Sequence, residues 1–164
     1  MQRMGRLIGY WLQESSNSWR KKSSEEYENM KKNIVNIINF VRAEDPRNTQ
    51  EELYDTYKRQ VQLCRQYPMP YTFLLQYDAL VRPEYVALLL QDPDPHCEVG
   101  IWIEMAQEQV EKCGLTWRGR PGYKWDWHVN PDLLMAYTLP QRKALIDEFF
   151  GKFLEVFGYY PKSV

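Results

Sequence analysis

Residues 71–90 read YTFLLQYDALVRPEYVALLL, and this stretch decides the fold. Its first part, YTFLLQY (71–77), is a short apolar run with aromatic and β-branched residues, which is typical of a buried strand. Pro83 then stands where a proline suits the first turn of a helix, so PEYVALLL is predicted to be helical. A strand followed closely by a helix is half of a βαβ unit, and repetition of this order predicts a parallel sheet.

The same order repeats on both sides of this stretch. IVNIINFV (34–41) and EVGIWIE (98–104) are the other predicted strands, so strand centres lie roughly 27 to 37 residues apart. Thr49 and Glu52 form a capping box for the helix between the first two strands, which should end near Tyr67. After the third strand, the short helix MAQEQVEKC is predicted to stop at Gly114.

A second capping box, Thr138 with Gln141, opens a long helix that should end at Gly158, and GYYPKSV is predicted to enter a fourth strand. We therefore expect an α/β fold. Residues 34–164 should form a partial (β/α) barrel of about three to four parallel strands with flanking helices, preceded by an N-terminal helical arm over residues 1–33. We expect this to be the N-terminal part of a barrel whose remaining strands are missing or supplied by another chain.

Composition narrows the class of protein. The chain has 164 residues, is 44% hydrophobic and carries a net charge of -1, so it can bury a core but has no basic surplus that would favour nucleic acid. No run approaches the ~20 apolar residues of a membrane span, and no signal peptide is visible, which leaves localisation open. The cysteines lack a CxxC pair and are expected to be free thiols: Cys64, Cys97 and Cys113.

Polar residues at the predicted strand ends are candidates for one site, because the C-terminal ends of parallel strands meet on one face. Asp45, Asp78 and Glu104 are the candidate catalytic carboxylates, since paired carboxylates can divide acid and base roles. Each also has a structural alternative: an ion-pair cluster for Asp45, an N-cap or turn for Asp78, and a helix cap for Glu104. Neighbouring strand-end residues are predicted to bind substrate: Arg42, Gln76 and Trp102.

The segment WRGRPGYKWDWHVN (117–130) concentrates aromatic and charged residues after the third strand. Aromatic faces stack on the C–H faces of sugar rings, and bidentate charged groups bind hydroxyls, so a carbohydrate ligand is predicted here. Alternatively, the tryptophans plug the end of the barrel and the arginines stack on them. The candidate substrate-binding residues are Arg118, Arg120, Trp125, Asp126, Trp127 and His128.

Metal and nucleotide chemistry find little support in the sequence. The two histidines, His96 and His128, do not have the spacing that places two imidazoles on one ion, and His96 precedes its strand. No GxGxxG or GxxxxGK[ST] motif is present. No cofactor and no metal site are therefore predicted, and the histidine pattern does not support a divalent metal.

Five stretches of the chain resemble a bacterial family of the polysaccharide deacetylase-like superfamily, the glycoside hydrolase/deacetylase β/α barrels. These are IINFVRAEDPR, YTFLLQYDAL, EVGIWIE, GLTWRGRPGYKWDWHVN and FGYYPKSV, which together span residues 37–164. The superfamily pattern has an aspartate pair after the first strand and a metal-binding histidine after an "EIG" third strand. Here Trp102 takes the histidine's place, and in RAEDPR only Asp45 or Glu44 stands in for the pair.

The resemblance implies a β/α barrel and a carbohydrate substrate, without the zinc ligand set. The leading hypothesis is a carbohydrate-active protein, the N-terminal portion of a hydrolase-like barrel that should be inactive as an isolated fragment. The alternative is a non-catalytic domain on the same fold, which binds a glycan or another protein.

Overall fold

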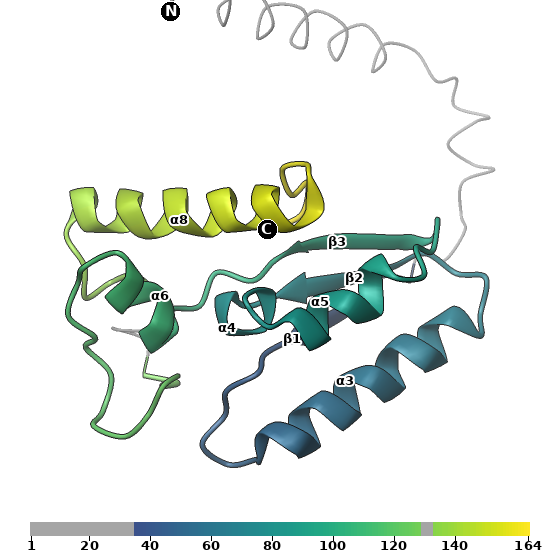
Figure 1. Ribbon diagram of the computed structural model, residues 1–164, viewed down its shortest axis with the longest axis horizontal. Coiled ribbons are helices and arrows are strands. Elements are labelled where there is room, and N and C mark those ends of the chain that lie inside the picture. The colour runs from purple at the N-terminus through teal and green to yellow at the C-terminus, as the bar shows by residue number, and fades with distance from the viewer. Residues whose placement is uncertain (1–34, 129–132) are drawn as a thin grey trace, which may run out of the picture. The chain divides into compact units, whose positions relative to one another are not determined.

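The computed structural model describes residues 35–128 and 133–164, and the predicted arm over residues 1–33 lies outside them. Strands and helices alternate along the chain (Figure 1). The elements are β1 (Ile37–Val41), α3 (Gln50–Arg65), β2 (Tyr71–Leu75), α4 (Tyr77–Leu80), α5 (Pro83–Leu90), β3 (Cys97–Ile101), α6 (Gln107–Lys112) and α8 (Leu139–Phe157).

The three strands form one parallel sheet in the order β1-β2-β3. The register aligns the strand ends, because Val41 pairs with Leu75 and Leu75 pairs with Ile101. This confirms the predicted α/β class with a parallel sheet. The sheet is open, with β1 at one edge and β3 at the other.

Local sequence signals begin and end the helices as predicted. In the capping box of α3, Glu52 N donates to Thr49 Oγ1 at 3.2 Å and Thr49 N donates to Glu52 Oε2 at 2.8 Å. Pro83 occupies the first turn of α5. The second capping box begins α8, which ends at Gly158 with a φ of 77°, a left-handed conformation that glycine adopts without steric cost.

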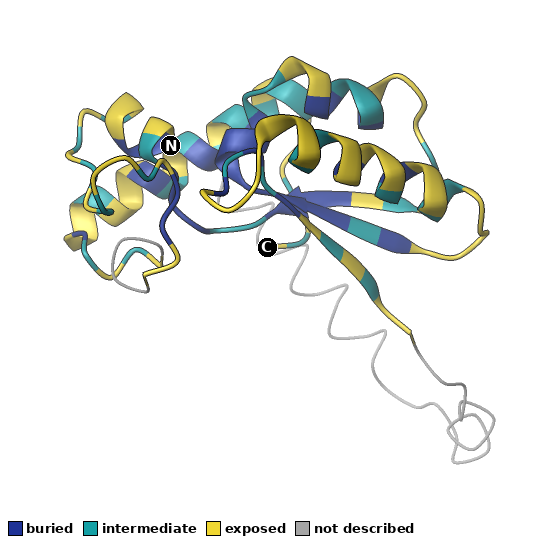
Figure 2. Cartoon of the chain, turned by 90° about the horizontal axis from the view of Figure 1, so that it is seen from below, coloured by how far each residue is buried: buried dark blue, intermediate teal, exposed yellow. Residues whose placement is uncertain are grey.

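The main core lies on one face of the sheet. Phe73, Leu75 and Ile101 point toward it from the strands, and α3, α5 and α8 all contribute buried side chains to the same cluster. In Figure 2 the buried residues concentrate in the central part of this sheet and in the segment that follows it. The opposite face is more open, since Ile38 is 48% exposed and Phe40 is 49% exposed.

Three predicted strands are longer than the observed ones. The strand predicted over 34–41 begins at Ile37, the one over 71–77 ends at Leu75, and the one over 98–104 ends at Ile101. After Leu75 the chain leaves the sheet and enters α4. The bond from Trp102 N to Leu75 O is therefore the last one that joins β3 to β2. After β2 the apolar pattern continues because Tyr77 is buried in α4.

The predicted fourth strand is wrong. Residues 158–164 form no strand, although Ile101 N donates a hydrogen bond of 3.1 Å to Ser163 O. This single bond places the segment beside the outer edge of β3, where Ser163 O also contacts Gly100. A single hydrogen bond to β3 does not make residues 158–164 a strand of the sheet.

Candidate functional site

The strand ends converge on Glu104, as the sequence predicted. Its Oε2 accepts hydrogen bonds from Arg42 Nη2 at 2.9 Å and Trp125 Nε1 at 3.1 Å, and Gln76 Nε2 lies 3.5 Å away. Arg42 follows β1, Gln76 follows β2 and Glu104 follows β3, so the parallel register brings the three together. We call these residues, with Trp125, the Glu104 cluster.

The Glu104 carboxylate is buried, and the neighbouring Arg42 guanidinium balances its charge. The Arg42 guanidinium lies 4.1 Å from the centre of the Trp125 ring, so it stacks on the indole while it pairs with the carboxylate. Gln76 Oε1 and Trp102 Nε1 are also buried, and neither has a hydrogen-bond partner within the described residues. Trp102 packs edge-on against Phe40 across the open face of the sheet.

Asp78 serves a different purpose from Glu104. It is buried in α4, and its carboxylate accepts hydrogen bonds from Ala43 N at 2.9 Å, Glu44 N at 2.6 Å and Ala79 N at 2.8 Å. It therefore ties the loop after β1 to the start of α4. Burial raises the pKa of Asp78 to about 7, because the three N–H donors only partly offset the cost of desolvating the charge.

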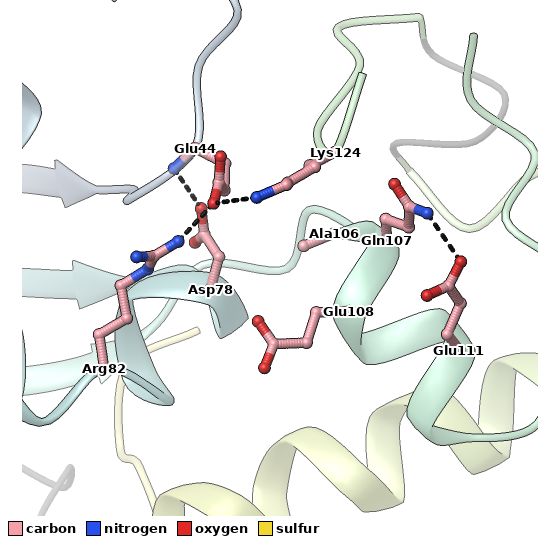
Figure 3. Close-up of a pocket in the computed structure, with 8 residues that line it drawn as sticks. All are labelled: Glu44, Asp78, Arg82, Ala106, Gln107, Glu108, Glu111 and Lys124. Atoms are coloured by element: carbon pink, nitrogen blue, oxygen red, sulfur yellow. Dashed lines mark hydrogen bonds and ion pairs between the residues drawn. The ribbon is translucent and has the colours of Figure 1, made fainter. Parts of the chain in front are cut away.

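A polar pocket of about 270 Å³ lies beside Asp78 (Figure 3). On one wall, the Glu44 carboxylate forms salt bridges with Arg82 and Lys124, and Lys124 Nζ lies 3.3 Å from Glu44 Oε1. On the other wall, Glu108 extends from α6 into the space between α4 and α6. We call this the Glu44 pocket.

The aromatic segment folds over itself. Asp126 is buried and forms a bidentate pair with Arg120, in which Nε lies 3.0 Å from Oδ2 and Nη2 lies 2.8 Å from Oδ1. This pair lowers the pKa of Asp126 to about 2. Trp117 Nε1 donates to Tyr123 O at 2.8 Å, and Trp125 is buried beside Ala106. These contacts pack the segment onto itself.

One ring of the segment faces outward. Trp127 is 45% exposed, whereas Trp125 is buried. The guanidinium of Arg120 lies 4.4 Å from the centre of the Trp127 ring, and that of Arg47 lies 5.5 Å from it. Arg47 is itself held by Asp45, through Nε to Oδ1 at 2.9 Å and Nη2 to Oδ2 at 2.6 Å, and this bond lowers the pKa of Asp45. We call Trp127, Arg47 and Arg120, with their two aspartates, the Trp127 platform.

The other predicted residues and His96 have different surroundings. Arg118 is directed to Tyr137, with its guanidinium 5.6 Å from the ring centre. His128 is exposed, and its backbone N lies 3.3 Å from Asp126 Oδ1. His96 is an exposed loop residue before β3, as expected, and contacts Asp94 at 3.1 Å. In the described ranges, no three His, Cys, Asp or Glu side chains are grouped to hold a metal ion.

Sequence reasoning missed the pairing within the Glu44 pocket. The sequence named Glu44 as a possible stand-in for the aspartate pair of the resembling family, and it did not single out Arg82 or Lys124. Their partners are 38 and 80 residues away in the chain, so no local spacing could reveal these pairs. The three cysteines are free, as expected.

Comparison of the chain with family models, with curated proteins and with solved structures found no match. Within the described ranges, no helix is long and apolar enough to cross a membrane. Any functional statement about the chain must therefore rest on its own geometry.

Proposed function

We propose that the chain is a glycan-binding domain, with the Trp127 platform as its contact surface. The observation that carries this proposal is a half-exposed indole with the guanidiniums of Arg47 and Arg120 near its ring, each held by a buried aspartate. Sugar rings present C–H faces that pack on indole and hydroxyls that accept hydrogen bonds from guanidinium groups.

The arginines of the platform are oriented for this task. In both of them Nε and Nη2 bind the aspartate, so Nη1 is directed away from the carboxylate. Neither Nη1 donates a hydrogen bond to another described residue. Because the side chains are already fixed, a ligand loses little binding free energy in ordering them.

The carboxylates favour binding over catalysis. Asp45 and Asp126 have lowered pKa values, since each is paired with arginine, and a carboxylate held in its charged form is a poor proton donor. Glu104 is occupied by its own cluster of donors.

A hydrolase is the second candidate, and one observation favours it. Asp78 lines the Glu44 pocket with a pKa near 7, the range in which a carboxyl group exchanges protons efficiently at neutral pH. Three backbone N–H groups bind the oxygens of Asp78. A substrate would therefore have to enter the Glu44 pocket to exchange a proton with this carboxyl group.

The test is titration calorimetry of the whole chain with a panel of soluble neutral oligosaccharides. Trp127→Ala should weaken binding about tenfold to thirtyfold, as expected for the loss of an aromatic anchor. Tyr160→Ala is the matched control, because this tyrosine is 61% exposed but lies outside the platform.

Equal affinities for the wild type and Trp127→Ala would exclude the platform as the binding surface. Hydrolysis of an acetylated or glycosidic substrate by the wild type, lost in Asp78→Asn, would establish the hydrolase instead.

A further inference from the structure

Within the described residues, the outer edge of β1 is bordered on the helix side of the sheet by two pockets that share Gln60, which together we call the groove. One pocket of about 270 Å³ lies between Ile37, Asn39 and the second half of α3, and another of about 220 Å³ lies between Val41 and the first half of α3. Both include Gln60, so together they run the length of the strand.

The outer edge of β1 carries backbone N–H and C=O groups that can bind another strand. Val41 O accepts a hydrogen bond from Gln76 N, so the backbone of Val41 faces β2. By the two-residue alternation of a strand, Ile38 and Phe40 turn their N–H and C=O groups to the free edge. Within the described residues, β1 pairs with β2 alone, whereas the outer edge of β3 is contacted by Ser163.

Among the described residues, β1 lacks the charges and prolines that protect exposed edge strands. IINFV contains no charge and no proline, and Ile38 and Phe40 are about half exposed. Apolar residues of α3 and the following turn are also exposed beside the groove, including Leu63, Tyr67 and Met69. An uncharged, apolar edge of this kind is a template for pairing with another strand.

We propose that this edge binds the β1 edge of a second copy of the chain, in antiparallel register about Asn39. A twofold axis there places Ile38 directly opposite the partner's Phe40, and both residues present outward backbone groups. Such isoleucine–phenylalanine pairs stabilise neighbouring strands. The two sheets then form a single six-stranded sheet.

Charge complementarity selects a second copy. In a twofold contact both strands present the same residues, so a strand with charges of one sign would repel its partner, and β1 carries no charge. The charges of α3 are segregated along its axis: the first half carries Glu51, Glu52 and Asp55, and the second half carries Lys58 and Arg59, whereas Arg65 pairs with Asp92 after α5. In the antiparallel arrangement the acidic half of one α3 faces the basic half of the other.

The inference goes beyond the proposed function and does not depend on it. Its test is sedimentation velocity of the full chain from low to high micromolar concentration, and we expect a dimer. Ile38→Lys should weaken the dimer at least tenfold and yield a species of half the mass. Leu90→Lys is the matched control, because Leu90 is an equally exposed leucine on α5 and should leave the dimer intact.

Cross-linking tests the register. Directly opposed residues of an antiparallel pair have Cα atoms about 5.5 Å apart, which suits a disulfide. An oxidised mixture of Ile38→Cys and Phe40→Cys should therefore form a covalent dimer that oxidised wild type lacks.

A folded monomer at every concentration would overturn the proposal. So would a monomer whose β1 amide hydrogens are protected from exchange, because a segment of the same chain would then occupy the edge. A dimer that survives Ile38→Lys and gives no cross-link would place the contact elsewhere and also overturn it.

Discussion

Replacing Asp78 with asparagine should remove a pH dependence from the stability of the protein. Asparagine has nearly the same shape as aspartate but does not titrate. The folded chain holds the Asp78 carboxyl in a buried site, where its pKa is raised to about 7 from an ordinary value of 3.8. The folded state therefore binds this proton more tightly than the unfolded state does.

The sign follows from linkage. A group whose pKa is raised by folding contributes stability that is fully present below its unfolded pKa and is lost as the pH rises through its folded pKa. The shift is about three pH units, and each unit corresponds to 1.36 kcal/mol, so the wild type should lose about 4 kcal/mol relative to Asp78→Asn between pH 4 and pH 8. The loss should level off above pH 7.

Urea unfolding at a series of pH values measures this difference. Other carboxylates, including Asp45 and Asp126, titrate in both proteins, so their contributions cancel when the two free energies of unfolding are subtracted. Asp55→Asn, an exposed aspartate on α3, is the control and should give a curve parallel to that of the wild type. Parallel curves for Asp78→Asn as well would refute the reasoning, because they would mean that the three backbone N–H groups keep Asp78 charged throughout.

Two further predictions concern packing and the aromatic segment. Gly100→Ala should destabilise the protein by about 1 to 3 kcal/mol, because the added Cβ would overlap Ser163 O and lie 2.7 Å from Leu74 Cδ2. Gly151→Ala, in open space on α8, should stabilise it by about 0.5 to 1 kcal/mol. Thermal unfolding measures both changes. Asp126→Ala should release the segment from its anchor, so trypsin should cleave after Lys124 faster than in the wild type, and an unchanged cleavage rate would contradict the assigned role of Asp126.

The order of elements was predictable because its signals are local. The capping boxes at Thr49 and Thr138 lie within four residues of sequence, and both form in the structure. Pro83 marks the start of α5 for a similarly local reason, since it has no N–H to satisfy. Such signals require no knowledge of the rest of the chain.

The ends of the strands were not predictable in the same way. Residues 76 and 77 continue the apolar pattern of β2, but Asp78 captures the N–H groups of Ala43 and Glu44 and draws the chain into α4. That contact joins residues 35 positions apart. Hydrophobicity alone cannot distinguish a buried strand from a buried helical turn, so the predicted strand extended too far.

The candidate site shows the same division. Parallel register was enough to predict that Arg42, Gln76 and Glu104 meet, because it aligns the three strand ends. Register could not reveal which carboxylates form ion pairs with arginine. These pairs determine which carboxylates can exchange a proton. Arginine pairing holds Asp45 and Asp126 in their charged form, and these two predicted site residues position the arginines near Trp127. Two ion pairs thus hold Arg47 and Arg120 near one exposed ring, an arrangement that supports the proposed recognition of a largely uncharged ligand.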